Sequence, residues 1–357
     1  MPNTSCPMPV TGMPHACSDS MIIVITGGSS GIGKATALAF ARRGDSVVIA
    51  ARSKDAVEAA ANEVEAAGGR ALAIVADVSR YDDVQRVADE ALAKFGAIDV
   101  WINNASVAEW SFIETMQPDD MRRIVEVDLV GTMYGCRAVL PHFRQRGGGT
   151  IINVASALAD RAIPLLSTYC AAKAGVKSFS DALRMEMRAT NANVDVVVIL
   201  PSSINTPFYT WGRSLLGVRP HPVSVIYPPG AVADAIVWAA DHPKRREVFV
   251  GVMGKLLSLG QRFSPELMDA YMLQRHEMFR QQYSVLADHG ESNLFQTNGE
   301  TRVNGDFTDD ARTTSLYTRA VETKPRWLRA AAAIGLVWFV YCRARPRGSR
   351  DKGVGGG

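Results

Sequence analysis

The sequence predicts an α/β protein built on a doubly wound parallel sheet of about seven strands, in three layers with helices on both faces. Two observations carry this prediction. From Met21 to about Gly254, short runs rich in β-branched residues alternate with longer alanine-rich stretches. The short runs are apolar without interruption, which is typical of strands buried on both faces of a parallel sheet.

The elements follow one another in regular alternation. The strands are predicted at 21–26, 46–50, 71–76, 98–103, 150–155, 194–200 and 247–251. The helices between them are predicted at 31–43, 55–67, 81–95, 118–145 and 168–189. Ligands of such sheets bind at the carboxyl ends of the strands, so those ends are where functional residues are expected.

Composition divides the 357 residues into four segments. Residues 1–20 contain four prolines and no apolar core of signal-peptide length, which predicts a disordered leader. Residues 21–254 contain the alternating strands and helices and are expected to form one domain. Residues 255–325 are polar and partly helical, and we expect this C-terminal helical extension to add nothing to the sheet. Residues 326–357 form a basic, apolar tail.

The tail concentrates the positive charge of the chain. Its seven basic residues and one acidic residue give a net charge of +6, which leaves −3 on the remainder of a chain whose total is +3. The main body therefore gives no reason to expect nucleic-acid binding. The apolar run 330–342 is shorter than the roughly 20 residues that cross a bilayer. We favour an interfacial membrane anchor within 326–347, although a helix docked on the domain or on a dimer partner explains the run as well.

The cysteines and histidines do not suggest a disulfide framework or a metal site. The five cysteines are odd in number and scattered, and the six histidines are equally dispersed. A reducing, cytoplasmic setting without a bound metal is expected. We also expect a homo-oligomer.

A glycine-rich stretch follows the first strand. "ITGGSSGIGKA" places Gly27, Gly31 and Gly33 at the junction with the first helix. Glycines permit a tight turn and let backbone N–H groups approach a pyrophosphate at the helix N-terminus. The second strand ends in "IAARSK", with Arg52 where a carboxylate would select against a 2′-phosphate. Arg52 could be a solvated loop cation. However, no acidic residue lies between the start of this strand and Asp55, and this absence favours NADP(H) over NAD(H).

The stretch "STYCAAKAG" places Tyr169 four residues before Lys173, on one face of a predicted helix. Alone, such a pair indicates only a polar helix face. Taken with five further motifs, it resembles the short-chain dehydrogenase/reductases in order and spacing over residues 21–254. The motifs are "TGGSSGIG" (26–33), "ADV" (76–78), "NNAS" (103–106), Ser156, "YCAAK" (169–173) and "PSSINT" (201–206).

This resemblance implies a Rossmann fold, a nicotinamide cofactor and a Ser–Tyr–Lys centre that interconverts a carbonyl and an alcohol. Tyr169 would act as the acid and base, Lys173 would lower its pKa and bind the nicotinamide ribose, and Ser156 would hold the substrate oxygen. The implied cofactor-binding residues are Thr26, Gly27, Ser29, Ser30, Gly31, Ile32, Gly33, Arg52, Asp77, Val78, Asn103, Ala105, Tyr169, Lys173 and Thr206.

Three positions depart from the family pattern. Ser106 and Ser202 replace common glycines, and Asp128 stands where an asparagine usually helps to hold a proton-relay water. An ionised Asp128 accepts hydrogen bonds but cannot donate them as an amide does, so the proton relay is in doubt. We nevertheless place Asp128 in the catalytic set.

The segment 204–229 falls where the family has its substrate lid, and it contains Phe208, Tyr209, Trp211 and Tyr227. These aromatic residues favour a lipophilic small-molecule substrate, although they could equally pack the lid onto the body. Two other functions stay open: a catalytically weak NADP(H)-binding regulator, for which Asp128 is the hint, and a membrane scaffold on the same fold.

Overall fold

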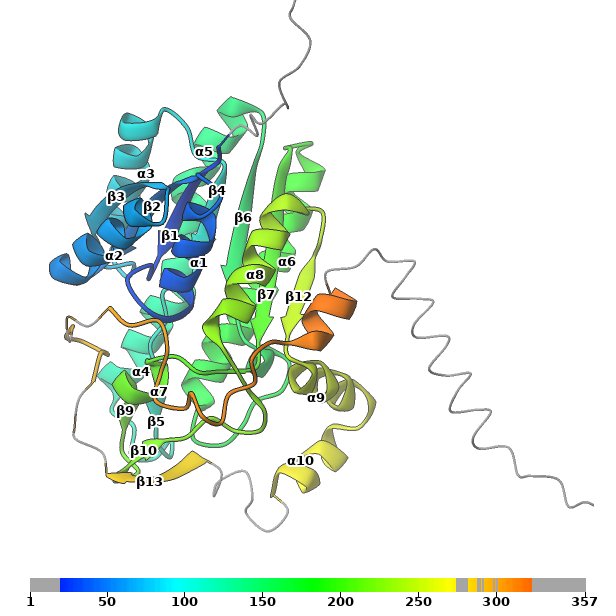
Figure 1. Ribbon diagram of the computed structural model, residues 1–357. Coiled ribbons are helices and arrows are strands. Elements are labelled where there is room, and N and C mark those ends of the chain that lie inside the picture. Colours follow the sequence, from blue (N-terminus) through cyan, green and yellow to red (C-terminus); the bar gives the residue numbers. More distant parts are fainter. Residues whose placement is uncertain are drawn as a thin grey trace, which may run out of the picture.

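The computed structural model describes residues 20–273, 282–287, 290, 292–297, 299 and 301–322. At its centre is one sheet of seven parallel strands in the order β12-β7-β6-β4-β1-β2-β3 (Figure 1). These strands are β1 (Ile22–Thr26), β2 (Ser46–Ala51), β3 (Arg70–Val75), β4 (Val100–Asn103), β6 (Gly149–Val154), β7 (Val194–Pro201) and β12 (Glu247–Val250). Each of the seven predicted strands is confirmed, and the predicted leader, except Ser20, and the predicted tail lie outside the described residues.

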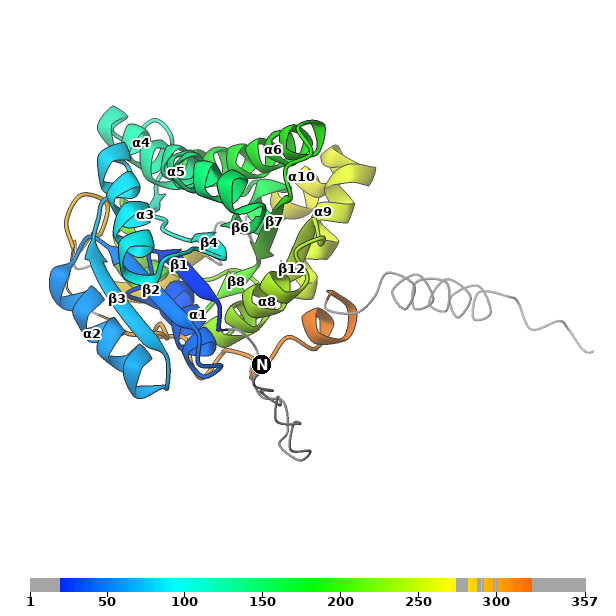
Figure 2. The same cartoon turned by 90° about the horizontal axis from the view of Figure 1, so that it is seen from above.

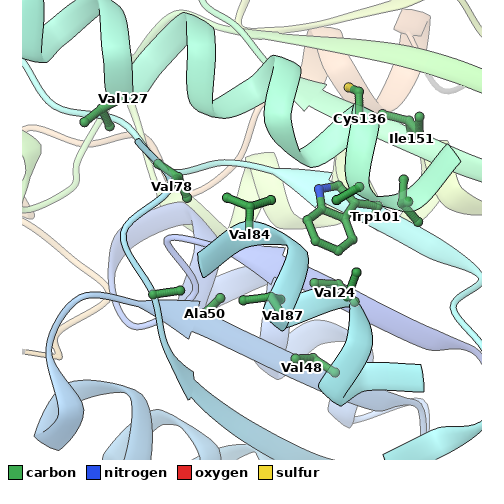
Figure 3. Close-up of a cluster of buried hydrophobic side chains, with 14 of the residues drawn as sticks. Val24, Val48, Ala50, Val78, Val84, Val87, Trp101, Val127, Cys136 and Ile151 are labelled. Atoms are coloured by element: carbon green, nitrogen blue, oxygen red, sulfur yellow. The ribbon is translucent and has the colours of Figure 1, made fainter. Parts of the chain in front are cut away.

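Helices cover both faces of the sheet (Figure 2). One face carries α1 (Gly31–Ala41), α2 (Lys54–Ala66) and α8 (Pro229–Asp241), and the other carries α3 (Tyr81–Phe95), α4 (Pro118–Val125), α5 (Gly131–Arg146) and α6 (Ser167–Ala189). The two layers bury separate hydrophobic cores against the sheet. On the face covered by α3 to α6, Trp101 of β4 lies with Val84 and Val87 of α3 in one buried cluster (Figure 3). The predicted three-layer arrangement is therefore confirmed.

The predicted helix 118–145 contains a break in its regular winding. Between α4 and α5 the chain makes one π-helical turn, η1 (Glu126–Val130). The extra residue in a π turn rotates the side chains that follow it, and such turns are frequent at functional sites. This turn carries Asp128, which is fully buried.

Short elements after β7 build a lid over the carboxyl ends of the strands. They are β8 (Ser203–Ile204), α7 (Phe208–Trp211), β9 (Arg213–Ser214), β10 (Val218–Pro220) and β11 (Ile226–Tyr227). The lid is tied to the body because β9 pairs with β5 (Glu109–Trp110).

The C-terminal extension begins within α9 (Val252–Phe263), three residues after that helix starts, and continues with α10 (Pro265–Leu273), β13 (Tyr283–Ala287) and the π-helical turn η4 (Thr318–Glu322). Within the described residues it adds no strand to the central sheet, and β13 pairs instead with β10 of the lid. No helix in the described part of the chain is both long and apolar enough to cross a bilayer. The apolar run 330–342 lies outside that part.

Candidate active site

A cavity of about 720 Å³ opens at the carboxyl ends of the strands. Its walls come from the glycine turn after β1, from the ends of β2 and β3, from the segments after β4, β6 and β7, and from α6 and the lid. The strand order reverses at the pair β1 and β4, and this reversal is where ligands of doubly wound sheets bind.

The glycine turn is packed too closely for side chains at two positions. Gly27 has φ +64°, and a Cβ there would lie 2.7 Å from the Cα of Ala105. A Cβ on Gly33 would lie 2.2 Å from the carbonyl oxygen of Gly27. Both positions therefore require glycine, and neither places a side chain between the start of α1 and an approaching pyrophosphate.

Most of the predicted site residues meet in this cavity. Those lining it are Gly27, Ser29, Ser30, Gly31, Ile32, Arg52, Asp77, Val78, Ala105, Ser156, Tyr169, Lys173 and Thr206. Thr26, Gly33, Asn103 and Asp128 are absent from the lining. Asn103 instead supports the floor from below, accepting a hydrogen bond from the indole of Trp101 at 2.8 Å and donating one to Asn153 at 2.9 Å.

Asn104 is a supporting residue that the sequence did not single out. Its side-chain amide donates to the carbonyl oxygens of Thr26 and Gly27 at 3.1 and 3.0 Å, and it lines the cavity. Because those bonds join β4 to the turn, Asn104 fixes the shape of the glycine turn. The doubled asparagine of "NNAS" was the only signal for it.

Ser156, Tyr169 and Lys173 converge on one side of the cavity. Ser156 follows β6, and its hydroxyl oxygen accepts a hydrogen bond from the N–H of Leu158 at 3.1 Å. The Lys173 ammonium lies 5.6 Å from the centre of the Tyr169 ring and donates to the carbonyl oxygen of Val154 at 3.2 Å. The helical spacing of four residues therefore places both α6 side chains at the same site.

Asp128 is joined to this group through Lys173. Its carboxylate lies 3.3 Å from the Lys173 ammonium and is fully buried. It also accepts hydrogen bonds from the Ser106 hydroxyl at 2.5 Å and from the N–H of Val107 at 2.9 Å. Two of the departures from the family pattern, Ser106 and Asp128, are thus bonded directly to each other.

The electrostatics of the phenol differ from the sequence-based expectation. Burial, followed by the Asp128 carboxylate, raises the pKa of Tyr169 well above its usual value, while the hydrogen bond with Ser156 acts in the opposite direction. Burial also raises the pKa of Asp128, against the attraction of Lys173. The sequence predicted that Lys173 lowers the pKa of Tyr169, but in the protein alone Asp128 counters that charge.

The other side of the cavity is mainly aromatic and aliphatic. The ring of Phe208 lies 5.5 Å from that of Tyr169 and 5.2 Å from that of Trp110, which contacts Tyr209 at 5.6 Å. Leu158, Ile163, Leu166, Val223, Met253, Leu257 and Met272 complete this part of the wall. Three of the four predicted lid aromatics, Phe208, Tyr209 and Trp211, line the cavity, and Tyr227 does not.

Arg52 lines the cavity at the end of β2, but its hydrogen-bond partners come from the extension. Its guanidinium donates to the carbonyl oxygens of Asn293, Leu294 (3.2 Å) and Gln296 (3.5 Å). Within the described part of the chain, no group of three or more His, Cys, Asp or Glu side chains is arranged to hold a metal ion.

Comparison with known proteins agrees with this architecture. The family model described as "short chain dehydrogenase" matches residues 21–212. An uncharacterised oxidoreductase of Bacillus subtilis, YxnA, is 36% identical over 329 residues that cover 91% of each chain, so the similarity extends into the C-terminal extension.

Solved structures show the same likeness. An alcohol dehydrogenase from Thermococcus sibiricus, complexed with 5-hydroxy-NADP, has a TM-score of 0.57 and 25% identity, covering 65% of this chain and 96% of its own. A 3-ketoacyl-(acyl-carrier-protein) reductase from Brucella melitensis, complexed with NADH, has a TM-score of 0.55 and 31% identity, covering 64% and 96%. The chain belongs to the short-chain dehydrogenase/reductase family of oxidoreductases.

Proposed function

We propose that the protein is an NADP(H)-dependent oxidoreductase that interconverts a carbonyl and an alcohol on a lipophilic small molecule. The observation that carries this proposal is the convergence of Ser156, Tyr169 and Lys173 in the cavity that also contains the glycine turn. A nucleotide site without those three side chains would bind a cofactor and have no acid or base for the reaction.

The residues present fit a nicotinamide dinucleotide. The turn at Gly27 and Gly33 has no room for Cβ atoms, which is the form that a pyrophosphate cradle takes. Asp77 and Val78 would hold the adenine. Ala105 would line the cofactor, and Thr206 would contact the nicotinamide carboxamide. When bound, the cofactor supplies or accepts the hydride.

The side chains of the chain manage the proton and the substrate oxygen. Tyr169 donates its phenolic proton to the oxygen during carbonyl reduction and takes it back as a phenolate during alcohol oxidation. Ser156 donates a hydrogen bond to the same oxygen and keeps it within reach of the phenol. Lys173 stabilises the phenolate, and Asp128 determines how much of the lysine charge is available for that purpose.

The preference for NADP(H) rests on the charge at the end of β2. Ala51 offers no carboxylate there, and Arg52 stands beside the cavity. The backbone carbonyls that Arg52 bonds carry no net charge, so its cation is not neutralised by them. A 2′-phosphate would be attracted to this cation. Both phosphorylated and unphosphorylated cofactors occur among the similar solved structures, so the fold alone does not select between them.

A lipophilic substrate is supported by the aromatic and aliphatic wall around Phe208, Tyr209 and Trp110.

A weakly active NADP(H)-binding regulator is the second candidate, because the ion pair of Asp128 with Lys173 opposes formation of the phenolate. The tail, to which we assign any contact with a membrane surface, lies outside the described residues.

The proposal is tested by following NADPH absorbance with a panel of lipophilic ketones and alcohols. At least one should be turned over, and Tyr169→Phe should reduce its turnover by about 10²–10⁴-fold, the usual contribution of general acid–base catalysis. NADPH binding to Tyr169→Phe, measured by titration, should persist. Turnover of an accepted substrate by Tyr169→Phe at the wild-type rate would contradict the mechanism. NADPH binding without any turnover across the panel would favour the regulator.

A further inference from the structure

One wall of the cofactor half of the cavity comes from the C-terminal extension. Residues 292–297 and 301–307, here named the strap, pass below the carboxyl ends of the strands, where the orange segment crosses Figure 1 from the α2 side toward η4. They lie beyond residues 21–212, the part of the chain that the family model describes. Three sets of contacts hold the strap in place.

The first set lies at the end of β2. Leu294 is fully buried in the hydrophobic core, and its carbonyl oxygen accepts hydrogen bonds from Arg52 at 3.2 Å and from Arg123 at 2.9 Å. Arg123 is held in turn by Asp77, whose carboxylate lies 2.7 Å from its guanidinium. Two residues that the sequence assigns to the adenosine end, Arg52 and Asp77, therefore also fix the strap.

The second set lies at the glycine turn. The N–H of Gly31 donates to the carbonyl oxygen of Arg302 at 3.1 Å. The hydroxyl of Thr301 donates to the carbonyl oxygen of Ser29 at 2.9 Å and accepts from the buried Lys34 ammonium at 3.0 Å. The strap is thus bonded directly to the turn that would hold the pyrophosphate.

The third set lies beside Thr206, the residue assigned to the nicotinamide. The N–H of Gly305 donates to the carbonyl oxygen of Asn205 at 3.1 Å, and the N–H of Phe307 donates to the Asn205 side chain at 3.0 Å. A Cβ on Gly305 would lie 2.5 Å from the carbonyl oxygen of Thr206. The three sets therefore follow the cofactor site from its adenosine end to its nicotinamide end.

The strap bounds this space without filling it. Asn293 and Thr297 line the same cavity as the glycine turn and Arg52, and that cavity still measures about 720 Å³ with the strap in place. We propose that the strap encloses the bound dinucleotide and controls its release, so that the cofactor leaves only after these contacts have opened. The identity of the ligand rests on the proposed function, whereas the enclosure rests on the contacts of the strap.

The proposal is tested by measuring dissociation of NADPH and of NADH by stopped-flow displacement from the full-length protein. Leu294→Ala should accelerate the release of both cofactors by roughly tenfold or more, because the buried anchor is lost and such changes act mainly on dissociation rates. Thr301→Val should accelerate both by a smaller factor. The matched control is Leu316→Ala, the same change at a side chain of the extension that is 74% exposed, and it should release both cofactors at the wild-type rate.

Hydrogen–deuterium exchange of the wild-type protein gives a second readout that needs no variant. Addition of NADPH should slow amide exchange in the strap as well as in the glycine turn. Wild-type dissociation rates in folded Leu294→Ala and Thr301→Val, or strap exchange that NADPH leaves unchanged while the glycine turn is protected, would overturn the enclosure. Failure of the wild-type protein to bind either cofactor would instead overturn the proposed function.

Discussion

Replacing Asp128 by asparagine should move the titration of Tyr169 to lower pH. The substitution removes one buried negative charge and keeps the size of the side chain. The amide oxygen can still accept from the N–H of Val107, and the amide N–H can donate to the Ser106 hydroxyl. An amide N–H in that place cannot accept a hydrogen bond from Lys173, so the substitution removes both the charge and the hydrogen bond of that pair. The effect reaches the phenol both directly and through Lys173.

Its magnitude follows from the geometry of the ion pair. At the 3.3 Å between the Asp128 carboxylate and the Lys173 ammonium, unit charges attract by about 5 kcal/mol with an effective dielectric constant of about 20. In Asp128→Asn this attraction is lost, and the lysine charge acts on the phenol unopposed. Since the Asp128 carboxylate is one of the causes that raise the pKa of Tyr169, we expect that pKa to fall in Asp128→Asn.

The assay is a pH series of kcat for one accepted alcohol and its ketone with saturating cofactor. Alcohol oxidation needs the phenolate, so its rate rises as pH increases through the pKa of Tyr169, and in Asp128→Asn the rise should occur at lower pH. Carbonyl reduction needs the phenol, so its rate falls above that pKa, and the fall should also move to lower pH. Turnover near neutral pH should be retained or increased, most clearly in the oxidation direction.

A control separates charge from hydrogen bonding. Ser106→Ala removes the hydroxyl that donates to Asp128 but keeps the carboxylate, so its profile should match the wild type wherever Asp128 is ionised. Superimposable profiles of wild type and Asp128→Asn would refute the electrostatic reasoning. Abolished turnover in Asp128→Asn would show that the reaction requires the carboxylate itself.

Three further predictions concern other parts of the chain. Arg52→Ala should weaken NADPH binding by roughly 1–3 kcal/mol more than NADH binding in parallel titrations, and equal losses would exclude a 2′-phosphate contact. Gly33→Ala should reduce both the NADPH affinity and the melting temperature, because its Cβ would lie 2.2 Å from the carbonyl oxygen of Gly27. The control Gly230→Ala, with nothing within 4 Å, should lower neither. Deletion of residues 326–357 should release the protein from liposomes and preserve turnover of a soluble substrate, and a full-length protein that ignores anionic and neutral liposomes alike would contradict the anchor.

The sheet was predictable because each of its strands is marked by a short, local sequence pattern. Each strand is one uninterrupted apolar run, and burial on both faces of the sheet is the physical reason for that pattern. The predicted helices 31–43, 55–67, 81–95 and 168–189 match α1, α2, α3 and α6 to within a few residues, because each is a long alanine-rich segment between two strands. The helix α8 had no predicted counterpart. The π turn at Glu126–Val130 was not predictable, since one extra residue in a helix leaves no mark in composition.

In the site, the residues carried by short motifs were easier to predict than their partners. Tyr169 and Lys173 meet because one helical turn separates them, which is visible in the sequence. The carbonyl oxygens beside Arg52 belong to residues more than 240 positions later, in a segment whose sequence indicates only a polar, partly helical extension. Backbone acceptors have no residue signature, so no reading of "IAARSK" could have found them.

The pairing of Ser106 with Asp128 links two departures that the sequence presents separately. A carboxylate buried at position 128 requires donors, and the serine supplies one where glycine would have no side chain to do so. The lysine supplies the opposite charge, which limits the cost of burial further. Asp128 is therefore accommodated by two neighbours, of which one is the lysine that acts on Tyr169. The ion pair with Lys173 both stabilises the buried Asp128 carboxylate and changes the charge that acts on the Tyr169 phenol. A substitution that removes the charge at position 128 must therefore also alter proton transfer by Tyr169.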